Sequence, residues 1–241
     1  MLNNKKSLII GNGPSTKLLL NYGFHNIPDD VDTYCTSNAY KFCEKLNWWP
    51  KYYVMGDFKV FLSKKEIFEN IVNDPSIPVK KFYFGVLTTH PAYKDIKNKF
   101  KDSLNKVEWV NHISSGYMSL NLAIKKKYSL IGMIGMDGVY TWFPDKMKSL
   151  GPPLYQYGQA MYLETIETHP SYFWPNYIEK GDIVRDIPEI PKNNSASMLS
   201  NIQKLIGGAK KQNITIYDYC DNKLVSNKTK NLDLVFKKEN I

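Results

Sequence analysis

A short glycine-containing motif near the start of the 241-residue chain carries the residues best suited to bind a ligand. Gly11-Asn12-Gly13-Pro14-Ser15 follows a short apolar run and precedes a segment with helical character. The glycines let the backbone approach a ligand closely, and Pro14 favours a first helical turn whose N–H groups are unpaired. The Asn12 amide can donate and accept hydrogen bonds, so it suits the base or ribose of a nucleotide. The motif is neither a GxGxxG fingerprint nor a P-loop.

A second cluster of small polar residues, Ser114-Ser115-Gly116, stands at the expected start of a helix. Hydroxyl groups and the unpaired N–H groups of a helix N-terminus can bind a phosphate or a carboxylate. A serine in this place is also a common helix cap, which requires no ligand. Both interpretations stay open, although the strand before this cluster should end at the same sheet edge as Asn12 and Asn38.

Two carboxylates, Asp57 and Asp137, directly follow expected strands and are candidates for contacts to a ribose or to an acceptor. Asp30-Val31-Asp32 has the DxD spacing of a divalent-metal motif. It precedes a strand, so it should lie at the amino edge of the sheet, and we interpret it as a turn. The histidines form no HxH or HExxH pattern and no GxSxG motif is present. The sequence therefore predicts neither a metal site nor a nucleophile-elbow hydrolase.

These residues need a scaffold, and strand and helix patterns alternate along most of the chain. Strands are expected at residues 6–10, 32–36, 52–55, 79–84, 107–110, 129–134 and 214–217. Helices are expected at 16–22, 39–46, 59–73, 92–104, from Gly116 to about 126, and at 196–211. This alternation predicts an α/β fold, with a Rossmann-like, mostly parallel sheet and helices on both faces. Ligands bind beyond the carboxyl ends of such strands, and five of those ends here carry small or polar residues.

The stretch from about 140 to 194 differs from the rest, with many aromatic residues and prolines but little periodicity. Within a single domain that spans residues 1–241, we expect it to form an irregular lid or an acceptor-binding wall. A packed structural excursion with no part in binding is the equal alternative.

The amino-acid composition limits the classes of protein to which this chain can belong. Hydrophobic residues make up 43% of the chain and charged residues 23%, as in a globular domain. No window approaches the ~18 apolar residues of a membrane span, and the three cysteines form no CxxC pair. These features exclude a disulfide scaffold, a zinc ribbon and a membrane-spanning protein, and they indicate a reducing, cytoplasmic compartment.

The basic charge has two interpretations. The formal net charge is +9, and Arg185 is the only arginine among the 32 basic residues. Lysine acts as a point charge, whereas the arginine fork reads phosphates and base edges more specifically. Solvated lysine-rich faces are therefore the first interpretation. Binding to DNA or to an anionic membrane surface, on the inner face of the membrane, is the alternative.

The order of these motifs resembles the bacterial sialyltransferases of glycosyltransferase family 42 and the related DUF115-type proteins. The matching pieces form islands over most of the chain, at residues 8–15 (LIIGNGPS), 28–32 (PDDVD), 37–40 (SNAY), 113–118 (ISSGYM), 130–137 (LIGMIGMD) and 214–224. The resemblance implies a variant GT-A fold, a CMP-activated sugar donor, inversion at the anomeric carbon, and no metal or other cofactor.

The resemblance also implies residue roles. The donor would be held by Gly11, Asn12, Gly13, Ser15 and Asn38 around the nucleotide, by Ser114, Ser115 and Gly116 at the sugar carboxylate or phosphate, by Asp137 near the ribose, and by Tyr140 with Tyr155 or Tyr157 at the leaving phosphate. Departure of an anionic phosphate without a metal needs such hydroxyl and amide donors.

This chain departs from the family at three places. His112 stands where the family has an arginine, and the family's asparagine after the third strand falls at Gly56 or Asp57. The family's general-base histidine, just before the helix at 196–211, has no counterpart. A base must come within ~3 Å of the acceptor hydroxyl, and His169 and Asp57 are the candidates.

We therefore expect a metal-independent, inverting glycosyltransferase that moves a sialic-acid-like sugar from a CMP-sugar to a hydroxyl of a glycan acceptor. One alternative is a phage or bacterial DNA-base glycosyltransferase that uses another nucleotide sugar. Others are a nucleotide-binding protein without transfer activity and a pterin diphosphokinase-like enzyme that needs Mg²⁺ and ATP. A homo-oligomer is also left open.

Overall fold

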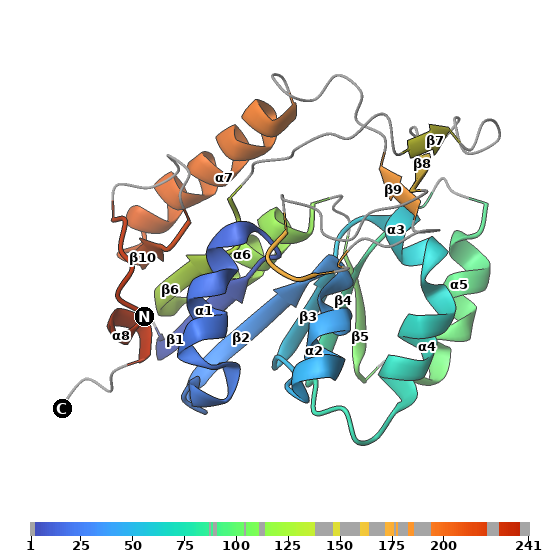
Figure 1. Cartoon of the computed structure of the whole chain (residues 1–241), viewed down its shortest axis with the longest axis horizontal. Helices are drawn as coiled ribbons and strands as arrows, with labels where there is room; N and C mark the ends of the chain where they lie inside the picture. The colour runs from blue at the N-terminus through green and yellow to red at the C-terminus, as the bar shows by residue number, and fades with distance from the viewer. Residues whose placement is uncertain are drawn as a thin grey trace.

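The computed structural model describes residues 3–86, 88, 91–103, 105–110, 114–137, 147–149, 160–163, 172–175, 177, 183–185, 194–220 and 227–236. Seven of the described strands form one parallel sheet in the order β10-β6-β1-β2-β3-β4-β5 (Figure 1). They are β1 (Asn3–Ile10), β2 (Val31–Thr36), β3 (Tyr52–Met55), β4 (Lys81–Gly85), β5 (Val107–Val110), β6 (Tyr128–Ile134) and β10 (Thr215–Asp218). The predicted α/β class, with a parallel Rossmann-like sheet, is confirmed.

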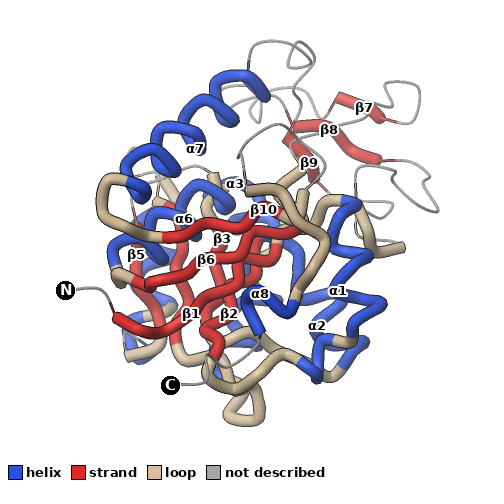
Figure 2. Tube along the Cα trace, turned by 90° about the vertical axis from the view of Figure 1, so that its left-hand side faces the viewer, coloured by secondary structure: helices blue, strands red, loops and turns tan. Residues whose placement is uncertain are grey.

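Helices cover both faces of this sheet (Figure 2). One face carries α1 (Lys17–Tyr22), α2 (Tyr40–Leu46), α3 (Phe58–Ser63), α4 (Lys65–Asn73), α5 (Tyr93–Lys99) and α8 (Asp233–Phe236). The other carries α6 (Ser115–Lys125) and α7 (Asn194–Lys210). Short 3₁₀ turns complete the described part: η1 (Pro14–Thr16), η2 (Phe24–Asn26), η3 (Ser37–Ala39) and η4 (Lys101–Ser103).

The core lies in two layers because successive strand residues point to opposite faces. In β1, Leu8 and Ile10 belong to the layer covered by α1, α2 and α8, whereas Ile9 belongs to the layer covered by α6; all three are fully buried. A strand that is covered on both faces has a continuous apolar sequence. For this reason the sequence predicts strands at residues 6–10 and 129–134.

The chain order places two distant loops side by side at the centre of the sheet. Strands β1 to β5 follow one another outward, and α6 then returns across the opposite face so that β6 pairs with β1. The register joins Leu8 to Gly132 and Ile10 to Ile134. The loops after β1 and β6 therefore meet where the winding reverses, which is the usual ligand position in such folds.

Two expectations about helices need correction. The helix expected at 59–73 is two helices, because Lys64 has φ −118° and ψ 16°, outside the helical region. The bend lets both Phe61 and Phe68 bury their rings against each other, with centroids 5.7 Å apart. The helix expected at 92–104 ends at Lys99 and continues as the 3₁₀ turn η4.

The aromatic stretch at 140–194 contains regular structure that its sequence did not indicate. Three short strands, β7 (Met147–Ser149), β8 (Ala160–Leu163) and β9 (Ile183–Arg185), form a second, antiparallel sheet. Most of the remaining residues of this stretch lie outside the described ones.

The Asp30-Val31-Asp32 motif lies at the amino edge of the sheet, as expected, because β2 begins at Val31. Asp32 is part of the strand rather than of a turn. Its carboxylate accepts a hydrogen bond from the Tyr128 hydroxyl (2.6 Å) and lies 3.2 Å from the Lys51 ammonium.

None of the described helices is both long enough and apolar enough to cross a membrane.

Candidate functional site

The loops that follow β1 and β6 are fastened together by hydrogen bonds, and we call this contact the β1–β6 junction. Gly13 N–H donates to the Gly135 carbonyl (2.9 Å), and Gly135 N–H donates to the Ser15 hydroxyl (2.8 Å). The Asp137 carboxylate accepts from both the backbone N–H (3.1 Å) and the hydroxyl (2.9 Å) of Ser15. Ser15 and Asp137 are buried. The predicted candidates Gly11, Gly13, Ser15 and Asp137 thus make contacts within the protein here.

Asn12 points away from this junction, toward the end of β2. Its Nδ2 donates to the carbonyl oxygen (2.9 Å) and hydroxyl (3.2 Å) of Thr36. Because a carbonyl only accepts, this contact fixes which end of the amide is nitrogen. The Oδ1 atom consequently faces the other way. It is buried and has no hydrogen-bond partner among the described residues.

Asn38 presents a second such oxygen. Its Oδ1 is also buried without a hydrogen-bond partner in the described part of the chain, and the residue is only 8% exposed. Ser37, just before it, has φ +54°, in the left-handed region that costs a non-glycine residue energy. The Tyr53 hydroxyl holds that conformation by donating to the Ser37 carbonyl (2.5 Å).

Tyr53 stays a neutral donor because of its surroundings. The side chain is fully buried, and burial raises the pKa of its hydroxyl well above the ordinary value, with Cys43 and Tyr177 adding to the effect. The same hydroxyl accepts from the Tyr40 N–H (2.8 Å). Tyr53 therefore supports the loop that carries Asn38 and is not expected to ionise itself.

The N-terminus of α6 borders the same place. Ser115 Oγ accepts hydrogen bonds from Gly56 N–H (2.7 Å) and Ser37 Oγ (3.1 Å), which leaves its own proton to donate. A Cβ built at Gly56 would lie 2.6 Å from the Ser115 nitrogen, so only glycine permits this approach. Ser114 caps the helix, with its hydroxyl 3.5 Å from Tyr117 N. The cap interpretation therefore holds for Ser114, and Ser115 retains a donor.

Part of the aromatic stretch contacts this side of the edge. Phe173 N–H donates to the Asn12 carbonyl and Asn38 N–H donates to the Tyr177 hydroxyl, both at 3.0 Å. The rings of Tyr172 and Tyr177 stack with centroids 4.4 Å apart. Sequence reasoning did not select Ser37 or Tyr177, because the first depends on a backbone dihedral and the second lies in a segment without periodicity.

These residues form what we call the Asn12–Asn38 side: Asn12, Ser37, Asn38, Gly56, Ser115 and Tyr177. It offers two buried acceptor oxygens at the same sheet edge as the Ser115 hydroxyl and the N-terminus of an eleven-residue helix. A buried acceptor without a partner costs free energy, about 1–3 kcal/mol. This arrangement can receive a ligand that carries hydrogen-bond donors at one end and a negative charge at the other.

Of the two candidate bases and the tyrosines expected at the leaving phosphate, the structure describes only Asp57. Asp57 follows Gly56 at the end of β3, and its carboxylate lies 3.3 Å from Val60 N at the start of α3. His112, Tyr140, Tyr155, Tyr157 and His169 lie outside the described residues. Gly116 lies beside Met136, whose Cε would be 3.0 Å from an added Cβ.

Other reactive groups near this edge have structural roles. Burial raises the pKa of the Cys220 thiol well above its ordinary value, and Asp218 and Asp137 raise it further, so the thiol is not a ready nucleophile. Its sulfur accepts from Met136 N–H (3.2 Å). In the described part of the chain, no group of three or more His, Cys, Asp or Glu side chains is placed to hold a metal ion.

Comparison with known proteins does not assign this chain to a family. No protein-family model matches the chain, and no curated protein matches it. Among solved structures, the chain is similar to the sialyltransferase CstII from Campylobacter jejuni in complex with a substrate analogue, cytidine-5'-monophosphate. The likeness covers 82% of this chain and 99% of that chain, at 16% sequence identity and a TM-score of 0.40. At this level the likeness assigns no function to this chain.

Proposed function

We propose that the protein is a glycosyltransferase that binds a CMP-sugar at the Asn12–Asn38 side and transfers the sugar to a hydroxyl of a glycan acceptor. The observation that carries the proposal is a pair of buried oxygens at one sheet edge, Asn12 Oδ1 and Asn38 Oδ1, that have no hydrogen-bond partner among the described residues. A cytidine nucleotide supplies donors of the required kind, in its exocyclic amino group and its ribose hydroxyls. The order of motifs described above supports the same ligand class.

The start of α6 is suited to the charged part of such a donor. The Ser115 hydroxyl and the first N–H groups of the helix favour a phosphate or a carboxylate, because the helix dipole places partial positive charge there. In the proposed reaction an acceptor hydroxyl attacks the anomeric carbon while the bond from that carbon to the phosphate oxygen breaks. Donors fixed near the phosphate stabilise the charge that grows on it, and no metal is required.

A base must take the proton of the attacking hydroxyl. Asp57 is the candidate within the described residues, since it lies at the end of β3 directly after Gly56. His169 is the other candidate. Proton transfer by a positioned base contributes roughly 10²–10⁴-fold to a rate. Asp57→Asn should therefore lower turnover by about that factor while nucleotide binding persists, if Asp57 is the base.

The test is a comparison of nucleotides followed by a turnover assay. Calorimetric titration should show CMP binding at least roughly tenfold more tightly than UMP, because uracil lacks the exocyclic amino group and would leave an acceptor unpaired. Release of CMP from CMP-sialic acid, followed with and without EDTA, then tests transfer and metal independence. No response to any cytidine nucleotide would refute the proposal. CMP binding without turnover for any CMP-sugar would identify a nucleotide-binding protein instead.

A further inference from the structure

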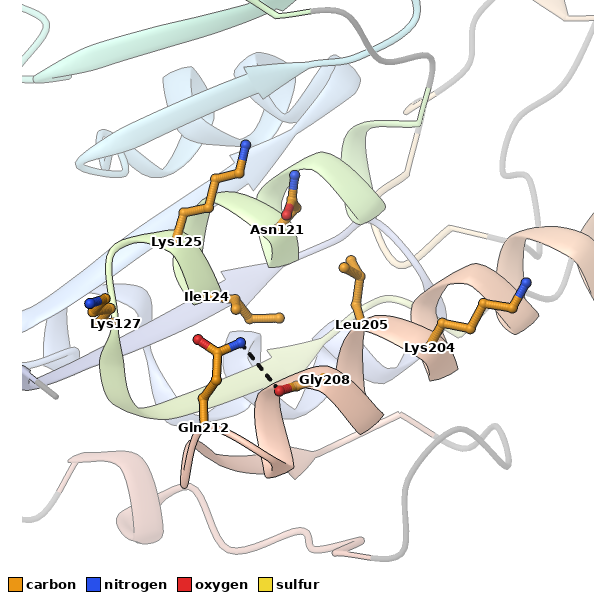
Figure 3. A pocket seen from close by; sticks show the side chains of 8 residues that line it. All are labelled: Asn121, Ile124, Lys125, Lys127, Lys204, Leu205, Gly208 and Gln212. Carbon is orange, nitrogen blue, oxygen red and sulfur yellow. Dashed lines mark hydrogen bonds between the residues drawn. The ribbon is translucent and has the colours of Figure 1, made fainter. Parts of the chain in front are cut away.

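A groove of about 410 Å³ lies between α6 and α7, on the face of the sheet opposite α1–α5 (Figure 3). It is formed at the C-terminal end of α6, the end away from Ser115. Ile124 and Leu205 lie between the two helices, and Lys125, Lys127 and Lys204 stand around them. The groove thus combines two apolar side chains with the polar Asn121 and Gln212 and with three lysines, whose side chains extend outward from it (Figure 3).

The charge around the groove has one sign. Helices α6 and α7 contain neither aspartate nor glutamate. Lys125, Lys127 and Lys204 make no ion pair with any residue that the structure describes. On the opposite face the helices carry acidic residues, among them Glu44 and Glu66. The charged side chains of α6 and α7 are therefore all basic, whereas the helices of the opposite face carry charges of both signs.

Two adjacent glycines lie in the part of α7 that borders the groove. Gly207 and Gly208 lie inside α7, where each costs about 1 kcal/mol relative to alanine. A Cβ added to either would meet nothing within 4 Å, so no described neighbour requires glycine. Gly208 lines the groove. Side chains at this place would narrow a depression that the lysines surround.

We propose that the α6–α7 face docks on an anionic phospholipid bilayer and that the groove receives one lipid phosphate headgroup. Charge complementarity requires an anionic occupant, since no carboxylate lines the groove. A partner protein would be held in register by charges of both signs, and the charged side chains that line the groove are all lysines. A bilayer of anionic lipids also has a single sign of charge, and each lysine near it contributes about 1 kcal/mol.

The chemistry of the face favours lipid over nucleic acid. Nucleic-acid sites rely on arginine forks and on aromatic rings that stack on bases, and neither lines this groove. Leu205, which is partly exposed, instead offers an apolar surface beside the lysines, as the glycerol and upper acyl carbons of a lipid require, with the buried Ile124 beneath it. A second copy of the chain would bring a like-charged face, which repels.

The experiment measures sedimentation of the full chain with vesicles of phosphatidylcholine, alone or mixed with phosphatidylglycerol. We expect binding to the mixed vesicles only, weakening as salt is raised. Replacing Lys125, Lys127 and Lys204 by glutamine should weaken it roughly tenfold or more. The matched control replaces the exposed Lys45, Lys94 and Lys97 of α2 and α5 by glutamine. This control removes the same charge and should retain most of the binding.

The outcomes distinguish binding of a lipid headgroup from binding of another anion and from an effect of net charge alone. Equal loss in the two triple variants would show a net-charge effect and overturn the proposal, as would unchanged binding in both. Gly208→Gln fills the groove without changing charge and should weaken vesicle binding severalfold; no effect would refute the headgroup in the groove. Binding of inorganic phosphate or duplex DNA to the same lysines, without binding to vesicles, would also overturn the proposal. Unaltered thermal melting of each variant shows that the fold is retained.

Discussion

The two parts of the carboxyl edge of the sheet contain similar polar residues, but the hydrogen bonding of these residues differs. At the β1–β6 junction every polar group described above has an internal partner, as Ser15 and Asp137 show. On the Asn12–Asn38 side, two equally buried side chains each keep an oxygen without a partner within the described chain. A fold gains stability from the first arrangement and loses some to the second. The difference supports the proposal that the junction holds the loops and that the other side binds a ligand.

The strongest perturbation of the junction is Gly135→Ala. Gly135 has φ +72°, and an added Cβ would collide with Thr16 Oγ1 and with the Gly11 backbone. We expect the free energy of unfolding to fall by about 3 kcal/mol or more. Urea unfolding measures the change. Gly207→Ala is the control, since its Cβ meets nothing within 4 Å and its helix should gain up to about 1 kcal/mol.

Ser15→Ala tests the hydrogen bonds of the junction without a steric clash. It removes the acceptor of Gly135 N–H and one donor to the Asp137 carboxylate, and it leaves buried polar groups less satisfied. A loss of about 2 kcal/mol in the free energy of unfolding is expected. Affinity for CMP, measured on the folded protein, should change less than it does in the Asn38 variant. A large loss of affinity with little loss of stability would contradict the structural role of Ser15.

Asn38→Ala tests the other side and should show the reverse pattern. Removing an oxygen that lacks a partner within the described part of the chain should cost little stability, whereas CMP should bind about tenfold more weakly, or about 1.4 kcal/mol. Calorimetric titration and thermal melting together separate the two effects. Asn70→Ala, at an exposed position of α4, is the matched control and should change neither quantity. Wild-type affinity in the Asn38 variant would remove this residue from the binding site.

The smallest expected effect isolates the left-handed backbone at Ser37. Both Ser37→Ala and Ser37→Gly remove the hydrogen bond to Ser115 Oγ, so their difference reports only the backbone. At φ +54° glycine should be favoured by about 1 kcal/mol in the free energy of unfolding. Equal stabilities would show that this loop relaxes when the hydroxyl is lost.

Sequence patterns predicted the central sheet because its strands are buried runs bounded by turn residues. The strands expected at 52–55 and 107–110 match β3 and β5, and the strand expected at 79–84 is shifted toward β4 at Lys81–Gly85. The short strands β7 to β9 were missed, because three or four residues among scattered aromatics show no alternation. Helix α4 starts anew after Lys64, a break that the apolar spacing did not indicate.

The site was predictable in its location and less so in its contacts. Asn12, Asn38 and Ser115 follow or precede strands whose ends share one edge, and the structure places all three there. Their part in binding stays a prediction. The pairing of Ser15 with Asp137 joins residues 122 positions apart, and the conformation of Ser37 depends on the Tyr53 hydroxyl. Such contacts arise from tertiary packing, which local patterns do not encode.

The return of α6 across the sheet also has a consequence for synthesis of the chain. Strands β1 to β5 pair in sequence order, but the other edge of β1 is covered only by β6, which ends at Ile134. While the ribosome makes the residues between, this apolar edge lacks its neighbour and can pair with other chains. We expect a nascent chain that stops before β6 to aggregate, and one extended past Asp137 to become protease-resistant as the two loops close.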